Sequence, residues 1–288
     1  MRIDKFMRML LIGTASISIL IVALIFLFLG KEAMPFAFDP GIGKLFDSAW
    51  VPVSFQEERF GLYPLVVGSS LVTLLAMLLS IPLSVVGAIY ISEVAKPVER
   101  EFLKPFIEIL ASIPSVVLGF FGLLVLAPLV KETFGLNSGL NALTASLLLA
   151  LMALPTIITI SEDALASVPQ SFKQASLALG ASELQTIFRV TVPAALPGII
   201  AAIMLGIGRV IGETMAVLMV SGNSAIISLF PLDPIRTMTA TIAAEMGEVP
   251  FGSHHYQALF WIGLMLLFVT FLLNAFSRVV LKKYGMSQ

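Results

Sequence analysis

Two charged residues, Arg209 and Glu213, stand inside a long apolar segment, residues 196–220. Residues four apart share one face of a helix, so we expect the two side chains to be neighbours. On membrane-insertion scales a central arginine and glutamate together cost about 5–6 kcal/mol, which nearly cancels what the apolar residues of such a segment return. The pair is therefore expected to face protein or a water-filled route rather than lipid.

Two interpretations of this pair are open. One is an ion pair that holds helices in register, and the other is a charged element on the route of a solute, the usual role of ionisable residues inside a membrane. An arginine suits an anionic solute because its planar guanidinium donates to oxyanion oxygens. A nearby carboxylate that competes for the arginine would favour release of the anion. Gly208 and Gly212 add a G-x-x-x-G spacing, which lets another helix approach closely.

The composition is that of a membrane protein. Of the 288 residues, 58% are hydrophobic and 12% are charged, whereas soluble domains contain about 25% charged residues. The mean hydropathy is +1.01. The net charge of −1 and the lack of a basic block give no indication of nucleic-acid binding. With no cysteine in the chain, disulfides and thiolate metal sites are excluded.

Apolar segments long enough to cross a bilayer, about 20 residues of helix, predict an all-α protein with six membrane spans. They are residues 9–29, 65–91, 106–130, 140–160, 196–220 and 258–276. The first is too long for a secretion signal and lacks a cleavage site after it, so we expect it to be retained. Residues 1–30 are thus an N-terminal transmembrane helix and residues 64–288 the transmembrane core. Residues 31–63 are an extracytoplasmic segment that either packs on the outer rim or contacts a partner protein outside the membrane.

Lysine and arginine placement predicts the orientation. With the N-terminus in the cytoplasm, most basic residues, such as Lys96, Arg100, Lys104 and Lys173, fall in inside segments. Cytoplasmic loops carry this excess in most membrane proteins. Both termini are therefore expected to face the cytoplasm.

Residues 166–198 are expected to form two short cytoplasmic helices. Ser167 and Gln170 fit a capping box at the start of the first, and Gly180 fits its left-handed end. Ser182 and Gln185 fit a second capping box. These helices expose apolar side chains without being long enough to span: Phe172, Leu177, Leu179, Leu184 and Ile187. Such a surface needs a partner, and the alternative is a helix that lies on lipid.

The segment QASLALGASELQTIFRVTVP, residues 174–193, resembles the signature loop of ABC-importer permeases. The family writes this loop as EAA, three residues, Gly, nine residues and Ile-x-Leu-Pro. The resemblance places Gln174, Ala175 and Ser176 at the EAA positions and Gly180 at the glycine, while valines replace the family's Ile and Leu. It implies that the loop, residues 161–193, docks on a cytoplasmic ATPase as a coupling helix, through these residues and Leu177.

Three further motifs resemble the PstC family of permeases from bacterial phosphate importers: IEILASIPSVVLGFFGL, GRVIGETMAVLMVSGN and TMTATIAAEMGE. The resemblance implies the type I ABC-importer permease fold, which is MetI-like, with five core helices after a peripheral N-terminal one. It places Arg209, Glu213 and Thr214 on the phosphate route. The implied partners are a PstA-like permease, two PstB-like ATPase subunits, a PstS-like phosphate-binding protein and membrane lipid.

The chain itself is not expected to be an enzyme. It has no G-x-x-x-x-G-K-[ST] loop, so ATP is expected on the partner subunits and no cofactor on this chain. A permease for another oxyanion, sulfate or molybdate, is the alternative of the same class. A third hypothesis is an ion-coupled carrier that uses Arg209 and Glu213 as a proton switch.

Two smaller expectations concern the outer side. His254 and His255 are adjacent, a spacing that does not suit a metal site, and we expect them to be exposed loop residues. Asp233 and Pro234 are the expected start of a helix that runs to Gly247, either as an anion-receiving half-helix or as a structural lid.

Overall fold

The computed structural model of the chain describes residues 2–54 and 56–284, and almost all of its regular elements are helices. Six helical segments in this part of the chain are long and apolar enough to cross a membrane. They are Met7–Phe46, Tyr63–Val94, Ser115–Phe134, Ala142–Ala166, Glu183–Gly212 and His254–Val279. The predicted all-α class and the number of spans are confirmed, but the bounds differ from those predicted, most of all in the first, third and fifth spans.

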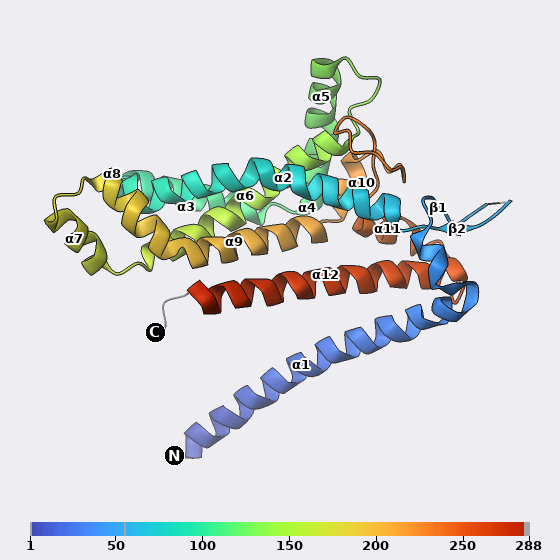
Figure 1. Ribbon diagram of the computed structural model, residues 1–288, viewed down its shortest axis with the longest axis horizontal. Coiled ribbons are helices and arrows are strands. Elements are labelled where there is room, and N and C mark those ends of the chain that lie inside the picture. The colour runs from blue at the N-terminus through green and yellow to red at the C-terminus, as the bar shows by residue number, and fades with distance from the viewer. Residues whose placement is uncertain (1, 55, 285–288) are drawn as a thin grey trace.

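The body of the molecule is a lengthwise helical bundle (Figure 1). It contains α2 (Tyr63–Ile89), α6 (Ala142–Ala166), α9 (Val192–Gly212) and α12 (His254–Tyr284). Helix α6 packs between α2 and α9, and α12 covers α9 from the other side. We call the end of the bundle that carries α7 (Gln170–Ala178) the α7 end. The opposite end carries the short antiparallel strands β1 (Trp50–Val51) and β2 (Arg59–Phe60), and we call it the hairpin end.

Small residues bring α9 close to α6. Gly198, Ala202 and Gly206 are spaced four apart and so share a face. A Cβ atom added at Gly206 would lie 2.6 Å from the Ile157 side chain of α6, and Ala202 is fully buried. Small residues at a helix interface let backbones approach, which is how helices pack where no hydrophobic effect drives them together. The G-x-x-x-G pair Gly208 and Gly212, by contrast, has no atom within contact of an added Cβ.

The N-terminal helix α1 (Arg2–Phe36) meets the bundle only near the hairpin end and diverges from α12 elsewhere (Figure 1). Two short helices, η1 (Ala37–Gly41) and η2 (Ile42–Phe46), then lead into the strands. Aromatic rings anchor this segment, with the centroids of Phe36 and Phe60 5.3 Å apart and those of Trp50 and Phe60 6.3 Å apart. The segment packs on α11 (Met238–Glu245) and α12.

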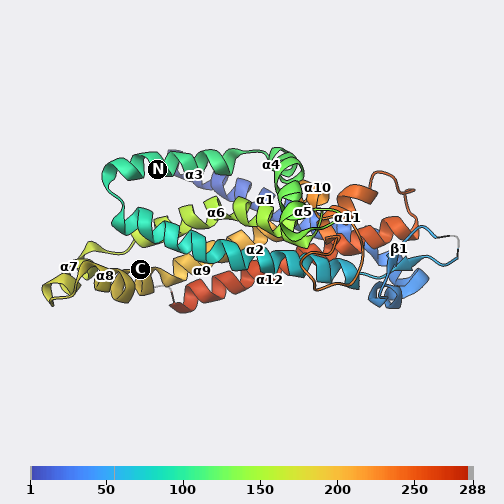
Figure 2. The same cartoon turned by 90° about the horizontal axis from the view of Figure 1, so that it is seen from above.

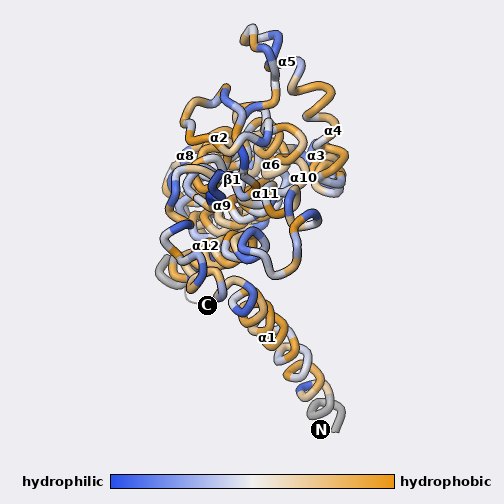
Figure 3. The backbone as a smooth tube through the Cα atoms, turned by 90° about the vertical axis from the view of Figure 1, so that its right-hand side faces the viewer, coloured by the Kyte–Doolittle hydropathy of each residue, from blue (hydrophilic) through white to orange (hydrophobic). Residues whose placement is uncertain are grey.

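The predicted third span, residues 106–130, is wrong in its bounds. Helix α3 (Pro97–Ser112) ends before Pro114, and α4 (Ser115–Phe121), η4 (Gly122–Leu126) and α5 (Ala127–Phe134) follow as a separate run. Ile113 is extended, with φ −64° and ψ 126°, because the ring of a following proline disfavours the helical conformation. Helix α3 runs along the bundle beside α6 (Figure 2), whereas α4 to α5 project sideways from it (Figures 1 and 3).

Helix α3 begins at a glutamate cap. The Glu99 carboxylate accepts the backbone N–H of Lys96 at 3.1 Å and the Tyr90 hydroxyl at 3.0 Å. Both bonds favour the ionised carboxylate, so the backbone bond first and the hydroxyl second hold the pKa of Glu99 below its ordinary value. The cap therefore stays charged at neutral pH.

The turns at the α7 end agree only in part with those predicted from the sequence. Gly180 has φ +83°, the left-handed end that was predicted. The Ser182–Gln185 capping box is confirmed at the start of α8 (Glu183–Thr186), which continues through η5 (Ile187–Thr191) into α9. The predicted box at Ser167 is wrong: this residue ends α6, and its hydroxyl donates to the carbonyl of Asp163 at 2.8 Å. Helix α7 instead begins after Pro169.

Candidate functional site

The fifth membrane-spanning segment is interrupted at the pair of charged residues. Helix α9 ends at Gly212, Glu213 is extended with φ −70° and ψ 132°, and α10 (Met215–Val220) starts after Thr214. The break lies well inside the bundle, because α2 and α12 both continue past it towards the hairpin end (Figure 1). The predicted continuous helix over residues 196–220 is therefore wrong, and Arg209 and Glu213 do not share a helical face.

Side chains satisfy the backbone at this break. The Glu213 carboxylate accepts the amide N–H groups of Thr214 at 3.2 Å and Ala216 at 3.4 Å. The Thr214 hydroxyl donates to the carbonyl of Gly212 at 3.2 Å, and the Thr239 hydroxyl donates to the carbonyl of Glu213 at 2.8 Å. Irregular backbone within a membrane is tolerated only where it is buried in protein or lines a water-filled cavity. Glu213 is thus a cap for α10 in this conformation.

Arg209 is exposed on the surface of the single chain, one turn before the break. It forms no ion pair or hydrogen bond with any other residue in the described part of the chain, and Glu213 is more than 4 Å from it. Its N–H donors therefore have no hydrogen-bond partner within the described part of the chain. The structure brings Glu213 and Thr214 together at the break and leaves Arg209 beside them with its hydrogen-bonding capacity unused within this chain.

Hydroxyl groups from two other elements gather at the break. Ser69 and Thr73 of α2, with Thr237 and Thr239 at the start of α11, line a small cavity of about 10 Å³ next to Glu213. The Ser69 hydroxyl accepts the backbone N–H of Met238 at 2.9 Å, which joins α2 to α11. Sequence reasoning missed Ser69 and Thr73, although their spacing of four on one face of an apolar helix was a usable signal.

The helix expected to start at Asp233 begins five residues later. Thr237 is the N-cap of α11, and its hydroxyl oxygen accepts the backbone N–H of Ala240 at 3.3 Å. Asp233 instead accepts the Ser228 hydroxyl at 2.5 Å within the preceding loop. The proline after Asp233 does not start the helix, because the chain between Pro234 and Thr237 remains extended along Gly222.

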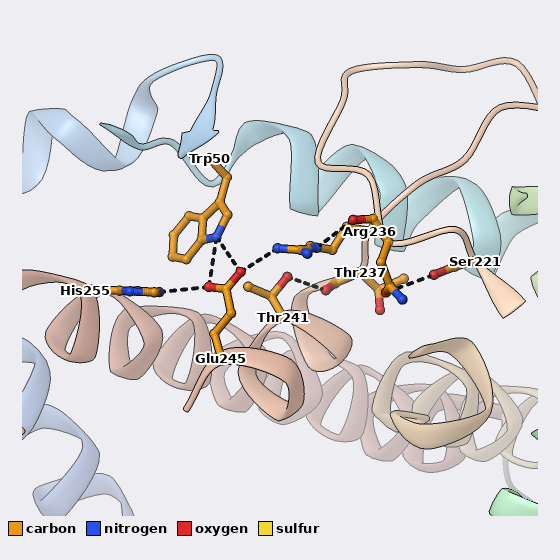
Figure 4. Close-up of polar contacts among 8 residues, drawn as sticks. Trp50, Ser221, Arg236, Thr237, Thr241, Glu245 and His255 are labelled. Carbon is orange, nitrogen blue, oxygen red and sulfur yellow. Dashed lines mark hydrogen bonds and ion pairs between the residues drawn. The ribbon is translucent and has the colours of Figure 1, made fainter. Parts of the chain in front are cut away.

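A carboxylate, Glu245, joins several segments at the hairpin end (Figure 4). It pairs with Arg236, accepts the Trp50 indole N–H at 3.0 Å, and lies 2.8 Å from Nε2 of His255. Arg236 also donates from Nε to the carbonyl of Asn223 at 3.0 Å. The prediction that His254 and His255 are exposed loop residues is wrong, since both lie in the first turn of α12 and the His255 side chain is only 13% exposed. His254 lies partly in solvent, 3.7 Å from Asp39.

The residues expected at the coupling surface lie on α7 and the turn after it. Gln174, Ala175 and Leu177 are exposed, whereas Ser176 is half-buried and its hydroxyl lies 2.9 Å from that of Thr186. Gly180 makes the turn, and Leu179 just before it is 90% exposed. Five apolar residues were expected to be exposed here, and four of them are uncovered at the α7 end: Phe172, Leu177, Leu179 and Leu184. The expectation is wrong for Ile187, which is 7% exposed because η5 packs it against the bundle.

Comparisons with known proteins agree on one class. Residues 80–285 match the family "Binding-protein-dependent transport system inner membrane component". The probable ABC transporter permease protein YqgH of Bacillus subtilis is 38% identical over 92% of this chain and 86% of its own length. The phosphate transport system permease protein PstC of Mesorhizobium japonicum is 34% identical over 84% of this chain and 79% of its own. PstC of Xylella fastidiosa is 31% identical over 97% and 91%.

Among solved structures, the fold is similar to that of a chain of the inward-facing MetNI methionine ABC transporter, with a TM-score of 0.59. That match covers 78% of this chain and 98% of the other at 18% sequence identity, so it concerns the fold alone. The family match over residues 80–285 identifies the chain as a membrane subunit of a transport system. An ATPase and a binding protein are the partners that such a subunit requires. The chain belongs to the family of binding-protein-dependent transport system inner membrane components, the permeases of ABC importers.

Proposed function

We propose that this chain is the PstC-like permease of an ATP-driven phosphate importer. In this proposal it forms the route for inorganic phosphate with a PstA-like permease, two PstB-like ATPase subunits drive the cycle, and a PstS-like protein delivers phosphate from outside. Relatives named PstC, 34% and 31% identical over most of the chain, support the choice of anion. Residues 161–193 are the coupling loop, and both termini face the cytoplasm.

The proposal rests on Arg209. An exposed guanidinium well inside a membrane-spanning bundle cannot face lipid without a cost of several kcal/mol. The surface that carries it must therefore meet water or another protein chain. Gly208 and Gly212 flank Arg209 and leave open space beside the helix, so a second permease has room to approach. Arg209 would then line the route between the two permeases.

The chemistry at the break suits an oxyanion in transit. Arg209 offers planar N–H donors to phosphate oxygens. The Thr214 hydroxyl, one residue beyond Glu213, can become a second donor by exchanging its bond to the Gly212 carbonyl for one to the anion. The Glu213 carboxylate repels an anion that stays near Arg209, and it is held on the amides of Thr214 and Ala216. Arg209 attracts phosphate, and Glu213 prevents it from remaining bound. A transport route needs this transient binding, whereas a storage site would hold the anion.

Uptake into vesicles tests this proposal. The assembled transporter, with its ATPase and binding-protein partners, is expected to accumulate labelled phosphate only with ATP, and an excess of sulfate or molybdate should not compete. Replacement of Arg209 by Gln should lower uptake by roughly 100-fold or more, the scale of a lost charge-assisted contact of about 3 kcal/mol. Arg59→Gln, which removes a half-exposed arginine at the hairpin end and outside the route, controls for the loss of a positive charge.

Two outcomes would contradict the proposal. Competition by sulfate or molybdate as strong as that by phosphate would assign the transporter to another oxyanion. Wild-type uptake by the Arg209→Gln protein would reduce Arg209 to a residue of the scaffold.

A further inference from the structure

Helix α7 is fastened to the bundle by two side chains on one of its faces. Lys173 and Ser176 are three apart and therefore lie on the same side of the helix. Lys173 Nζ donates to both carboxylate oxygens of Glu93 in η3 (Tyr90–Val94), each at 2.8 Å. The Ser176 hydroxyl lies 2.9 Å from the hydroxyl of Thr186 in α8. One face of α7 is thus attached to the bundle while the opposite face, with Gln174, is exposed.

Each attachment point leads directly into a membrane-spanning helix. Glu93 lies at the end of the continuous span Tyr63–Val94, which contains α2, and Thr186 lies near the start of the span Glu183–Gly212, which contains α9. Helix α9 carries Arg209 and ends at the break, whereas α2 supplies Ser69 and Thr73 beside Glu213. The two attachments therefore connect α7 to both helices that form the walls of the break.

The Glu93 attachment is itself held in place. Arg100 of α3 donates from Nε to the carbonyl of Ile91 at 2.8 Å and from Nη2 to the carbonyl of Ser92. The side chains of Lys173 and Glu93 are only 16% and 7% exposed. An exposed lysine pair is screened and mobile, whereas this one is sheltered from water and keeps its geometry. The connections at the two ends of α7 are different: they are short turns, one of them made at Gly180.

We infer that the Lys173–Glu93 ion pair and the Ser176–Thr186 bond transmit a displacement of α7 to α2 and α9 together. Lys173 and Glu93 are then positioning residues for transport: they touch no solute, and they couple the movement of α7 to the break at Glu213. Without the ion pair, α7 would turn about Gly180 and move α9 without α2. The inference rests on the proposed docking of an ATPase on the exposed face of α7.

The number of ATP molecules hydrolysed per anion carried tests this linkage. Glu93→Gln and Lys173→Met proteins, assembled with their partner subunits in vesicles, should keep ATP hydrolysis while the ratio of ATP to anion rises by roughly 2- to 30-fold, the range for residues that carry coupling between sites. The exchanged pair Glu93→Lys with Lys173→Glu should restore the ratio. Glu57→Gln, which breaks the Lys44–Glu57 pair at 3.1 Å on the hairpin end, is the matched control and should leave the ratio unchanged.

The possible failures are distinguishable. A wild-type transporter that carries a different anion corrects the proposed function, and the ratio is then measured with that anion. A wild-type ratio in Glu93→Gln would overturn the linkage whatever the anion. If Glu93→Gln abolishes co-purification of the ATPase, restoration by the exchanged pair supports the linkage, and failure to restore it overturns the linkage.

Discussion

The Glu245 side chain joins three segments of the chain at the hairpin end. Its carboxylate meets an indole from the N-terminal segment, a guanidinium from the loop before α11 and an imidazole from α12 (Figure 4). Glu245 is 16% exposed and Arg236 is 22% exposed. If the carboxylate is removed, the half-buried guanidinium keeps its desolvation cost but loses the interaction that offsets it.

We therefore expect Glu245→Gln to destabilise the hairpin end. The loss should be on the order of 2 kcal/mol, below the range of a fully buried pair, because Arg236 keeps its bond to the Asn223 carbonyl and part of its hydration. Thermal unfolding of the purified protein in detergent measures the effect as a lower Tm. Glu57→Gln, whose carboxylate is 57% exposed, should leave the Tm unchanged. Equal Tm values for the two variants would contradict the role assigned to Glu245.

The close contact between helices α6 and α9 depends on the face of α9 that carries Gly198, Ala202 and Gly206. A side chain at Gly206 would collide with Ile157, whereas Gly208 has nothing beside it. Over-filling a packed interface forces backbone shifts, because protein interiors have few voids. Gly206 and Gly208 thus belong to opposite sides of the same helix.

This difference gives a paired test. Gly206→Leu should cost about 1–3 kcal/mol, the usual penalty for over-packing, and should lower the yield of folded protein in size-exclusion chromatography. In the chain expressed without a second permease, Gly208→Leu adds the same volume on the open face and should leave that yield unchanged. Loss of folded protein in Gly208→Leu alone, with Gly206→Leu normal, would mean that the wrong face of α9 has been assigned to α6.

The same elements show what the sequence can predict. Segments such as α2, α6 and α12 were predicted because length and hydropathy suffice when a helix is apolar throughout. Hydropathy averaged over a window cannot detect the breaks at Pro114 and Glu213, because apolar residues continue on both sides of each. It also cannot choose between faces when small residues occur on both, so Gly208 and Gly212 were predicted as a helix contact while Gly198 and Gly206 were missed. Arg209 was found because a charge among apolar residues is visible without any structure.

The charged side chains discussed above lie in three places in the molecule: at its two ends and at the break between them. The α7 end carries the Lys173–Glu93 pair, the hairpin end carries Glu245, and the break carries Arg209 and Glu213. The start of α1 and the end of α12 lie at the α7 end (Figures 1 and 2), as an even number of spans requires. If the α7 end faces the cytoplasm, a displacement that starts there must pass along the bundle before it reaches the break at Glu213.

The absence of cysteine makes this orientation directly measurable. Val53 at the hairpin end is 81% exposed and Leu179 at the α7 end is 90% exposed. A cysteine at either position should therefore be accessible to a thiol reagent. A membrane-impermeant maleimide should label Val53→Cys in intact cells and Leu179→Cys only in inverted vesicles. In those vesicles, co-expression of the ATPase subunits should slow labelling of Leu179→Cys, because a docked subunit would cover α7. Labelling of Leu179→Cys from outside would reverse the topology, and labelling unaffected by the ATPase would place the docking surface away from α7.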